Sequence, residues 1–316
     1  MLPMPKHADL SRRAFLNRCA AIAAATGLPL WVVERDLSAA QSTTPAPGPN
    51  DRPGIALIGC GGMGRGDAKS AARFGTIVAV CDADEAHAEM AAKQFANGAT
   101  QPEKFTDFRR VLDRKDVHAI INGTPDHWHT LINVGAARAG KDIYAEKPLT
   151  LTVDEGKRLV KEVRKRRVVL QTGTQQRSNK LFRTAAELVR NGRIGKLTKV
   201  TVYLPAGLRE GPFTPQPVPA GLHWDLWLGQ APKVEYLKER CHSTFRWWWD
   251  YSGGPVTDWG AHHNDSARWA IGLDGPTRVE ARALTEPIPG GYTTPPAFES
   301  TLTWANGVTQ VVRTTP

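Results

Sequence analysis

The sequence has few cysteines and no apolar run of membrane-spanning length. Four cysteines occur in 316 residues, and the three that follow residue 40, which are Cys60, Cys81 and Cys241, do not make a disulfide framework. A spanning helix needs about 20 apolar residues, and the mostly apolar run 19–33 is shorter. The sequence therefore excludes a disulfide-stabilised scaffold. We expect free thiols at Cys60 and Cys81 and no membrane span after processing.

The chain has a net positive charge but no motif typical of nucleic-acid-binding proteins. The formal charge is +10, but the densest basic cluster, residues 161–167, ends a predicted helix, where cations favour the helix dipole and face water. We therefore expect no nucleic-acid partner. We find no internal repeat, and 41% apolar and 23% charged residues are ordinary for a globular protein. A length of 316 residues predicts two domains.

The first forty residues have the features of an export signal. Twin arginines, Arg12 and Arg13, precede the apolar run, and small residues end at Ala40, where cleavage is expected. Residues 1–40 are therefore predicted to be a twin-arginine signal peptide that uses the twin-arginine export machinery and delivers the protein to the periplasm. An amphipathic helix or a membrane anchor is the alternative. Residues 41–53, rich in Pro, Ser and Thr, are predicted to be a flexible leader.

A glycine-rich loop follows the first predicted strand. The apolar run 55–58 leads to Gly59, Gly61 and Gly64, which have the GxGxxG spacing. The first glycine permits a tight turn, the second lets the backbone approach a pyrophosphate, and the third lets the next helix pack closely. A second apolar strand leads to Asp82. This residue follows the glycine loop by about 20 residues, where dinucleotide-binding proteins carry a carboxylate that binds the ribose hydroxyls. The pattern predicts a dinucleotide site, with a glycine-rich turn that binds nothing as the alternative.

Two types of sheet are predicted. Strands and helices alternate over residues 54–175, which is typical of a doubly wound parallel sheet and predicts an NAD(P)-binding Rossmann domain. Residues 176–316 are predicted to be an α+β substrate domain with an open, mainly antiparallel sheet, interrupted by an insertion at 205–254 that is rich in Pro and Trp. Its strands are expected at 199–204, 278–284, 300–304 and 308–313, with a hairpin at 305–307.

The joint spacing of five motifs resembles the glucose-fructose oxidoreductase and inositol dehydrogenase family. The motifs are the glycine loop, Thr124-Pro125 with His129, Glu146-Lys147-Pro148, the segment 183–197, and Gly253-Gly254 followed by Asp258-Trp259-Gly260-Ala261-His262. The resemblance implies a Rossmann domain followed by an open antiparallel sheet, with the active site between them, and a homo-oligomer formed through that sheet. Members of the family continue past the strand at 308–313, so we expect a sheet that is incomplete at Pro316.

The resemblance also implies roles for individual residues. The family's catalytic roles fall on Lys147, Asp258 and His262. Glu146 is implied to approach the nicotinamide ribose. The full set expected to bind the cofactor is Gly59, Gly61, Gly62, Met63, Gly64, Asp82, Thr124, Pro125, His129, Glu146, Lys147 and Gln175.

One predicted helix brings together groups suited to proton transfer. Asp258, His262, Asp265 and Trp269 are spaced four, three and four residues apart, so they share one face of a helix. A histidine titrates near neutrality, and a carboxylate one turn earlier can orient substrate and tune it. Lys147, at a strand end, can polarise the reacting oxygen. The alternatives are a helix cap at Asp258, a packed surface histidine and a solvated lysine.

Aromatic residues are concentrated in the second half of the chain. Eight of the ten tryptophans lie between residues 224 and 304. Most are expected in the core, and one or two on the substrate, because flat aromatic faces stack on sugars. No metal is expected at His262 and His263 with His242, Asp258 and Asp265, since adjacent histidines point about 100° apart on a helix. Substrate contacts are predicted for Arg177, Trp249, Tyr251 and Asp265, with Arg246 also available for hydroxyls.

Together these features predict an NAD(P)-dependent oxidoreductase that transfers hydride between nicotinamide and a secondary alcohol of a sugar, polyol or glycoside. Asp82 disfavours a 2'-phosphate, which favours NAD over NADP. Because an exported protein meets no recycling pool of nicotinamide, the cofactor is expected to be tightly bound and reoxidised in place. The alternatives are an NAD-dependent glycosidase or lyase that uses transient oxidation, and a non-catalytic sugar-binding protein on the same scaffold.

Overall fold

The computed structural model describes residues 17, 20–22, 33, 52–98 and 100–315. The chain divides into two compact units, Met1–Arg52 and Pro53–Pro316, and the features below belong to the second. The predicted signal peptide and leader lie almost entirely outside the described residues, so both stay predictions. Within the described part, no helix is long and apolar enough to cross a bilayer.

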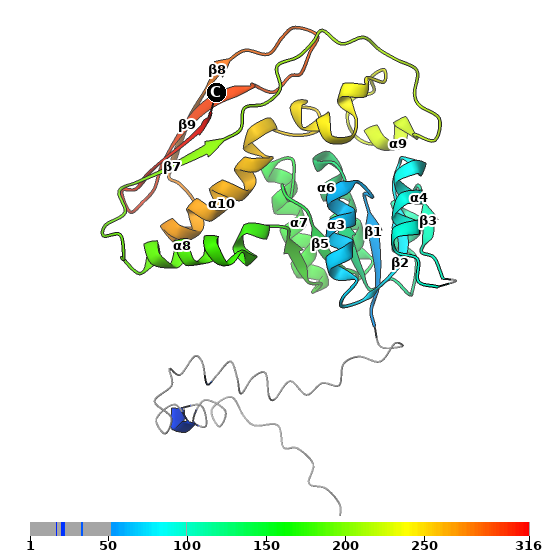
Figure 1. The fold of residues 1–316 in the computed structure, drawn as a ribbon, viewed down its shortest axis with the longest axis horizontal. Coiled ribbons are helices and arrows are strands. Elements are labelled where there is room, and N and C mark those ends of the chain that lie inside the picture. Colours follow the sequence, from blue (N-terminus) through cyan, green and yellow to red (C-terminus); the bar gives the residue numbers. More distant parts are fainter. Residues whose placement is uncertain (1–16, 18–19, 23–32, 34–51, 99, 316) are drawn as a thin grey trace, which may run out of the picture. The chain divides into compact units, whose positions relative to one another are not determined.

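A parallel sheet of six strands occupies the first half of the second unit, as predicted (Figure 1). Its spatial order is β3-β2-β1-β4-β5-β6, and every neighbouring pair is parallel. The strands are β1 (Gly54–Ile58), β2 (Thr76–Cys81), β3 (Glu103–Phe105), β4 (Ala119–Asn122), β5 (Asp142–Ala145) and β6 (Leu170–Thr172). All of β1 is buried, as expected for a central strand with helices on both faces.

Helices cover both faces of this sheet. They are α3 (Gly62–Ala71), α4 (Glu85–Gln94), α5 (Phe108–Leu112), α6 (Asp126–Arg138) and α7 (Val153–Arg166). Successive side chains of a strand point to opposite faces, so Ala56 and Ile58 of β1 join one apolar core while Ile55 and Leu57 join another. The strand order reverses between β1 and β4, and ligands of such sheets bind at the carboxyl ends of the strands beside that point.

A second sheet has the order β7-β10-β9-β8. Its strands are β7 (Lys199–Leu204), β8 (Arg278–Thr285), β9 (Ala297–Thr303) and β10 (Thr309–Thr314). Strands β8, β9 and β10 pair antiparallel, with the predicted hairpin between the last two. Strand β7 instead pairs in parallel with β10. The alternation of apolar and polar residues in the sequence does not predict this parallel pairing, because it indicates which face of a strand is buried and not the direction in which the strand runs. The sheet is therefore mixed and mainly antiparallel, in agreement with the predicted fold class.

One long helix links the second sheet to the first. Helix α10 (Trp259–Ile271) packs on the sheet through Ala267, which shares a core with Val202 and Phe298. Helix α8 (Lys180–Arg190) lies beside α10 (Figure 1). Just before α10, Asp258 contacts Lys147 at the end of β5. The N-terminal end of α10 therefore faces the carboxyl ends of the parallel strands.

The insertion between β7 and α10 forms an aromatic core of its own. It contains α9 (Trp224–Leu228) and the short helices η2 (Lys238–Arg240), η3 (His242–Trp247) and η4 (Gly254–Val256). Trp227 and Trp248 are buried in this core, as expected for most of the tryptophans. The Trp227 carbonyl accepts a hydrogen bond of 2.9 Å from Trp128 of α6, which fixes the insertion to the first sheet. Residues 53–316 form one unit, so the predicted domain boundary at residue 175 stays a prediction.

Candidate active site

A cavity of about 540 Å³ lies at the carboxyl ends of β1, β2, β4 and β5, under the insertion. Most of the residues predicted to bind a cofactor line it, and the insertion adds Trp227, His242 and Arg246. The predicted residues in the lining are Gly59, Gly61, Gly62, Met63, Asp82, Thr124, Pro125, Glu146 and Lys147. The cavity is therefore shared between the glycine loop and the insertion.

The glycine loop has the geometry that a pyrophosphate site requires. Gly59 has φ +88°, and a Cβ there would lie 2.4 Å from the Thr124 nitrogen. A Cβ on Gly64 would lie 2.0 Å from the Gly59 carbonyl oxygen, so this glycine permits close packing of α3 and is not part of the cavity lining. At Gly61 and Gly62, by contrast, a Cβ would meet nothing within 4 Å. These two glycines leave open space in front of the N-terminus of α3, whose backbone N–H groups favour an anion.

Asp82 is fixed at the end of β2 by the backbone around it. Its two carboxylate oxygens accept hydrogen bonds from the Cys60 nitrogen at 2.6 Å and the Asp84 nitrogen at 2.9 Å. The Cys60 and Cys81 thiols are buried and free, as expected. Burial raises the pKa of both thiols well above the ordinary value. The carboxylate is thus held at the cavity wall beside two unreactive thiols.

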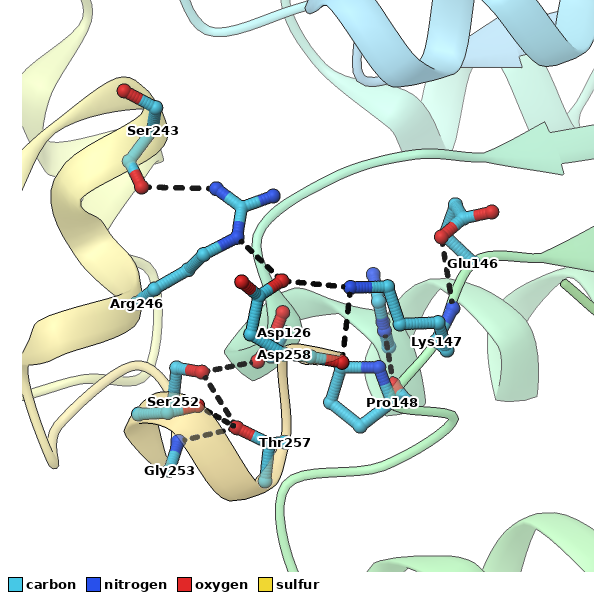
Figure 2. Close-up of polar contacts among 12 residues, drawn as sticks. Asp126, Glu146, Lys147, Pro148, Ser243, Arg246, Ser252, Gly253, Thr257 and Asp258 are labelled. Atoms are coloured by element: carbon cyan, nitrogen blue, oxygen red, sulfur yellow. Dashed lines mark hydrogen bonds and ion pairs between the residues drawn. The ribbon is translucent and has the colours of Figure 1, made fainter. Parts of the chain in front are cut away.

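Lys147, Asp258 and Arg246 form a charged network beside the cavity (Figure 2). Lys147 Nζ donates to Asp258 Oδ1 at 2.9 Å, and Arg246 Nε donates to the same oxygen at 3.1 Å. Burial opposes the charge on Asp258, but the two cations outweigh it and hold the pKa of this carboxyl below its usual range. Lys147 and Arg246 line the cavity, and Asp258 lies behind them. Asp258 is thus an ionised carboxylate that positions two cations.

His262 follows Asp258 by one helical turn and is only 4% exposed. Burial, followed by the nearby charge of Lys147, lowers the pKa of His262 to about 4. Its Nδ1 atom is buried and has no hydrogen-bond partner among the described residues. The imidazole is therefore neutral near pH 7 and keeps a nitrogen available for a proton.

Three predicted cofactor or substrate residues are placed differently. His129 is 1% exposed, with its ring nitrogens 2.6 Å from the Pro148 carbonyl and 2.8 Å from the Thr124 carbonyl. It holds two loops together, and the predicted contact with a cofactor stays a prediction. Tyr251 is fully buried, and its hydroxyl accepts from Arg240. The ring of Tyr251 packs in the insertion core, and its predicted substrate contact stays a prediction. Gln175 is exposed and lies outside the cavity lining, so its role stays a prediction.

The other predicted substrate residues lie on and near α10. Arg177 makes a two-pronged contact with Asp265, at 2.6 Å and 2.9 Å. The guanidinium of Arg177 also lies 5.2 Å from the ring centre of Trp269, which confirms the shared helix face of Asp265 and Trp269. Trp249 is 56% exposed and available to a ligand. Asp265 and Arg177 are already paired with each other, so a substrate hydroxyl at this position would bind to a preformed ion pair.

Two acidic groups of the site were not predicted. Asp126, at the start of α6, lines the cavity, and burial raises its pKa to about 7. Ser252 Oγ donates to Asp126 at 2.5 Å (Figure 2). Burial and the neighbouring Glu146 also raise the pKa of Asp67 in α3 to about 7. Asp126 lies between Pro125 and His129 of the family motif. An acid in the first turn of a helix has a local explanation, because a negative charge there interacts favourably with the helix dipole. Asp67 carried no signal.

The chain matches the sequence profile of an oxidoreductase family with an NAD-binding Rossmann fold over residues 54–174. Residues 183–288 match the C-terminal alpha/beta domain of an oxidoreductase family. The scyllo-inositol 2-dehydrogenase (NAD(+)) of Bacillus subtilis (strain 168) is 27% identical over 223 residues, which cover 69% of this chain and 54% of that protein. The chain thus spans about half the length of the curated relatives that it matches.

Two further similarities are informative. A glycosyl hydrolase family 109 protein of Shewanella pealeana (strain ATCC 700345 / ANG-SQ1) is 30% identical over 165 residues, which cover 46% of this chain and 35% of that protein. The solved structure of a levoglucosan dehydrogenase in complex with NADH and levoglucosan has a TM-score of 0.63 and 24% identity. It covers 83% of this chain and 66% of the other. This second likeness shows a common fold.

Proposed function

Because this chain belongs to the Gfo/Idh/MocA oxidoreductase family, we propose that it is an NAD-dependent oxidoreductase acting on a secondary alcohol of a sugar, polyol or glycoside. The observation that carries the proposal is the contact of Lys147 and Arg246, two cavity-lining cations, with Asp258, next to a neutral His262. Removal of a hydroxyl proton requires a cation and a proton acceptor close to each other. Lys147 lines the cavity, and His262, which does not, lies close enough to Lys147 for that charge to lower the pKa of the histidine.

The residues present fit a dinucleotide. The open space at Gly61 and Gly62 admits a pyrophosphate next to the N-terminus of α3. The Asp82 carboxylate lines the same cavity and can accept hydrogen bonds from ribose hydroxyls. When bound, the nicotinamide accepts or supplies the hydride. Asp82 disfavours a 2'-phosphate, so NAD is the proposed cofactor.

Lys147, His262 and Asp258 have different roles in the proposed reaction. Lys147 holds a positive charge in the cavity wall and stabilises the oxygen as its proton leaves. His262 accepts that proton, because its imidazole is neutral and has a buried nitrogen without a partner among the described residues. Asp258 keeps Lys147 and Arg246 in place through one shared oxygen. The arrangement uses three elements: the end of β5, the insertion and the start of α10.

We extend the proposal to tight cofactor binding in an exported protein. The twin arginines and the small residues before Ala40 support export through the twin-arginine machinery to the periplasm. Outside the cytoplasm no soluble nicotinamide pool renews the cofactor, so a bound cofactor must be reoxidised in place. Cleavage near Ala40, shown by the N-terminal mass of the periplasmic protein, tests this part; an unprocessed cytoplasmic chain contradicts it.

A homo-oligomer through the second sheet is also proposed. Along β8, Val279 is 59% exposed and Leu284 is 49% exposed, and such side chains at a sheet edge are suited to contact another chain. Light scattering on the purified protein measures its mass in solution and so tests for an oligomer. A mass of one chain at micromolar concentration contradicts it.

A second candidate function is an NAD-dependent glycosidase or lyase, in which transient oxidation precedes bond cleavage. The similarity to a glycosyl hydrolase family 109 protein favours it. The deciding experiment offers the protein a panel of sugars, polyols and glycosides and analyses the products by mass. Loss of two hydrogens from an intact substrate supports the oxidoreductase. Cleavage of the glycosidic bond without net oxidation supports the glycosidase.

A further inference from the structure

Three metal-binding side chains gather at the Asp82 end of the cavity, away from the Lys147 network. They are Asp84, His87 and His242, and their ligand atoms all lie within 4.8 Å of one another. Asp84 caps the N-terminus of α4, His87 lies in the first turn of that helix, and His242 begins η3 in the insertion. The cluster therefore joins two elements that lie about 160 residues apart in the sequence.

The side chains face one another closely. His242 Nε2 lies 3.5 Å from Asp84 Oδ2, and the two imidazole rings have centroids 4.6 Å apart. Asp84 uses its other oxygen, Oδ1, to accept from the Ala86 nitrogen, so Oδ2 remains for a ligand. Asp82 Oδ2 lies 3.7 Å from His87 Nδ1 and adds a second carboxylate. The negative charges of two carboxylates can balance the charge of one dication.

The backbone also favours this arrangement. His242 has φ 52°, in the left-handed region that a residue with a Cβ seldom adopts. Such conformations cost free energy and occur mostly where a function requires them. At His242 this backbone brings the imidazole to Asp84 and His87, and the preceding Cys241 stays buried in the insertion core.

We propose that Asp84, His87 and His242 bind a divalent transition-metal ion, with Zn²⁺ as the best match. Two histidines and one carboxylate are a donor set typical of zinc, which takes three protein ligands and one further ligand. Zinc bond lengths place tetrahedral ligand atoms about 3.3 Å apart. The separation of His242 Nε2 and Asp84 Oδ2, 3.5 Å, is close to that value, and the side chain of His242 is 44% exposed.

A metal here ties the insertion to the first helical turn after Asp82. His87 and His242 both line the cavity, so the ion becomes part of its wall. From the sequence, no metal is expected at His262 and His263 with His242. His242 belongs to the present cluster, whereas His262 and His263 take no part in it. His263 instead contacts Gln176. The metal proposal stands independently of the proposed oxidoreductase activity.

Zinc titration of the full chain tests the proposal. Tag-free, chelator-treated protein is titrated with Zn²⁺ by calorimetry, and one equivalent is expected to bind. Asp84→Asn and His242→Gln are each expected to weaken binding at least about tenfold, as loss of a metal-site group does. Asparagine caps a helix as well as aspartate does, so Asp84→Asn leaves the start of α4 intact. His223→Gln is the matched control, because His223 pairs with Glu85 on the same helix, outside the cluster.

Cobalt gives a second readout that does not depend on the variants. Co²⁺ bound to the unmodified protein is expected to show the strong visible absorption of a four-coordinate site, and Zn²⁺ is expected to remove it. Far-UV circular dichroism verifies that each variant is folded. The proposal is overturned if the unmodified protein binds no Zn²⁺, or if folded Asp84→Asn and His242→Gln proteins bind it as tightly as His223→Gln does.

Discussion

Lys147 Nζ and Arg246 Nε donate to the same oxygen atom of Asp258, Oδ1, at 2.9 Å and 3.1 Å. The lysine comes from the end of β5 and the arginine from η3 in the insertion. One carboxylate therefore fixes the spacing of two cations that line the cavity. If this contact organises the site, its members affect catalysis more strongly than folding.

Lys147→Met is expected to lower turnover by roughly 100- to 1,000-fold, because a positioned donor to the reacting oxygen is lost. Methionine matches the length of the lysine stem, so the fold should persist. Lys233→Met is the control, since the Lys233 side chain is 87% exposed and far from this network. Steady-state kinetics on both variants measure the effect. Equal activity of Lys147→Met and Lys233→Met contradicts the role of Lys147.

His262→Gln is expected to lower the rate of alcohol oxidation by roughly 100- to 10,000-fold, the range for loss of a general base. The pKa of His262 is about 4, and a base acts in its deprotonated form. The oxidation rate of the unmodified enzyme should therefore stay level from neutrality down to about pH 5 and fall below it. A rate-controlling ionisation near pH 6.5 that disappears in His262→Gln contradicts a pKa of about 4 for His262.

The Lys147–Asp258 pair should show energetic coupling. The two side chains are 10% and 17% exposed, so the pair is largely shielded from water. A double-mutant cycle with Lys147→Met and Asp258→Asn, measured by urea unfolding, is expected to give a coupling of about 1–3 kcal/mol. The double variant should be more stable than Asp258→Asn alone, which leaves Lys147 and Arg246 without their carboxylate. Additive effects would contradict the pairing.

Asp126 should make stability fall as the pH rises. Burial raises its pKa from 3.8 to about 7 in the folded state, so the folded protein binds this proton more tightly than the unfolded chain does. That stabilisation is complete below about pH 4 and is lost as the pH rises to about 7. Relative to the unmodified protein, Asp126→Asn should therefore gain up to roughly 4 kcal/mol of unfolding free energy between pH 4 and pH 8.

Urea unfolding of both proteins at pH 4 and pH 8 measures this gain. Asparagine keeps an oxygen that can accept from Ser252, so the packing is retained. Asp225→Asn is the control, because the Asp225 side chain is 85% exposed. Parallel pH profiles for Asp126→Asn and the unmodified protein would show that Asp126 is not a buried acid with a raised pKa.

Gly61→Ala is expected to abolish dinucleotide binding and leave folding intact. A Cβ at Gly61 meets nothing within 4 Å of protein but occupies the space in front of α3, where the backbone must approach a pyrophosphate. Gly66→Ala is the control, since a Cβ there is equally free of contacts and lies outside the cavity lining. Calorimetric titration with NAD compares them. Unchanged binding by Gly61→Ala contradicts the assignment of the loop.

The sequence was sufficient for features that depend on local pattern. The buried strand β1, the glycine loop and Asp82 at the end of β2 follow from apolar runs and glycine spacing, and the structure places them together. The shared helix face of Asp265 and Trp269 follows from helical periodicity. The resemblance of motifs added Lys147 and Asp258, whose contact spans 111 residues of sequence.

What the sequence missed depends on three-dimensional packing. The pairing of Asp126 with Ser252 spans 126 residues and carries no periodic signal. Tyr251 follows three consecutive tryptophans and was assigned to the substrate, yet it is fully buried. A short irregular segment gives no period from which its buried face can be read. The parallel pairing of β7 with β10 was hidden for the same reason, because partner and direction are set by the whole sheet.

The most direct test of the central claim is to purify the protein without added nucleotide, denature it, and identify any released dinucleotide by mass and by absorbance in the reduced-nicotinamide band. We predict close to one NAD or NADH per chain, held in the cavity between the glycine loop and Arg246. A protein that releases no dinucleotide and also fails to bind added NAD would contradict the oxidoreductase proposal.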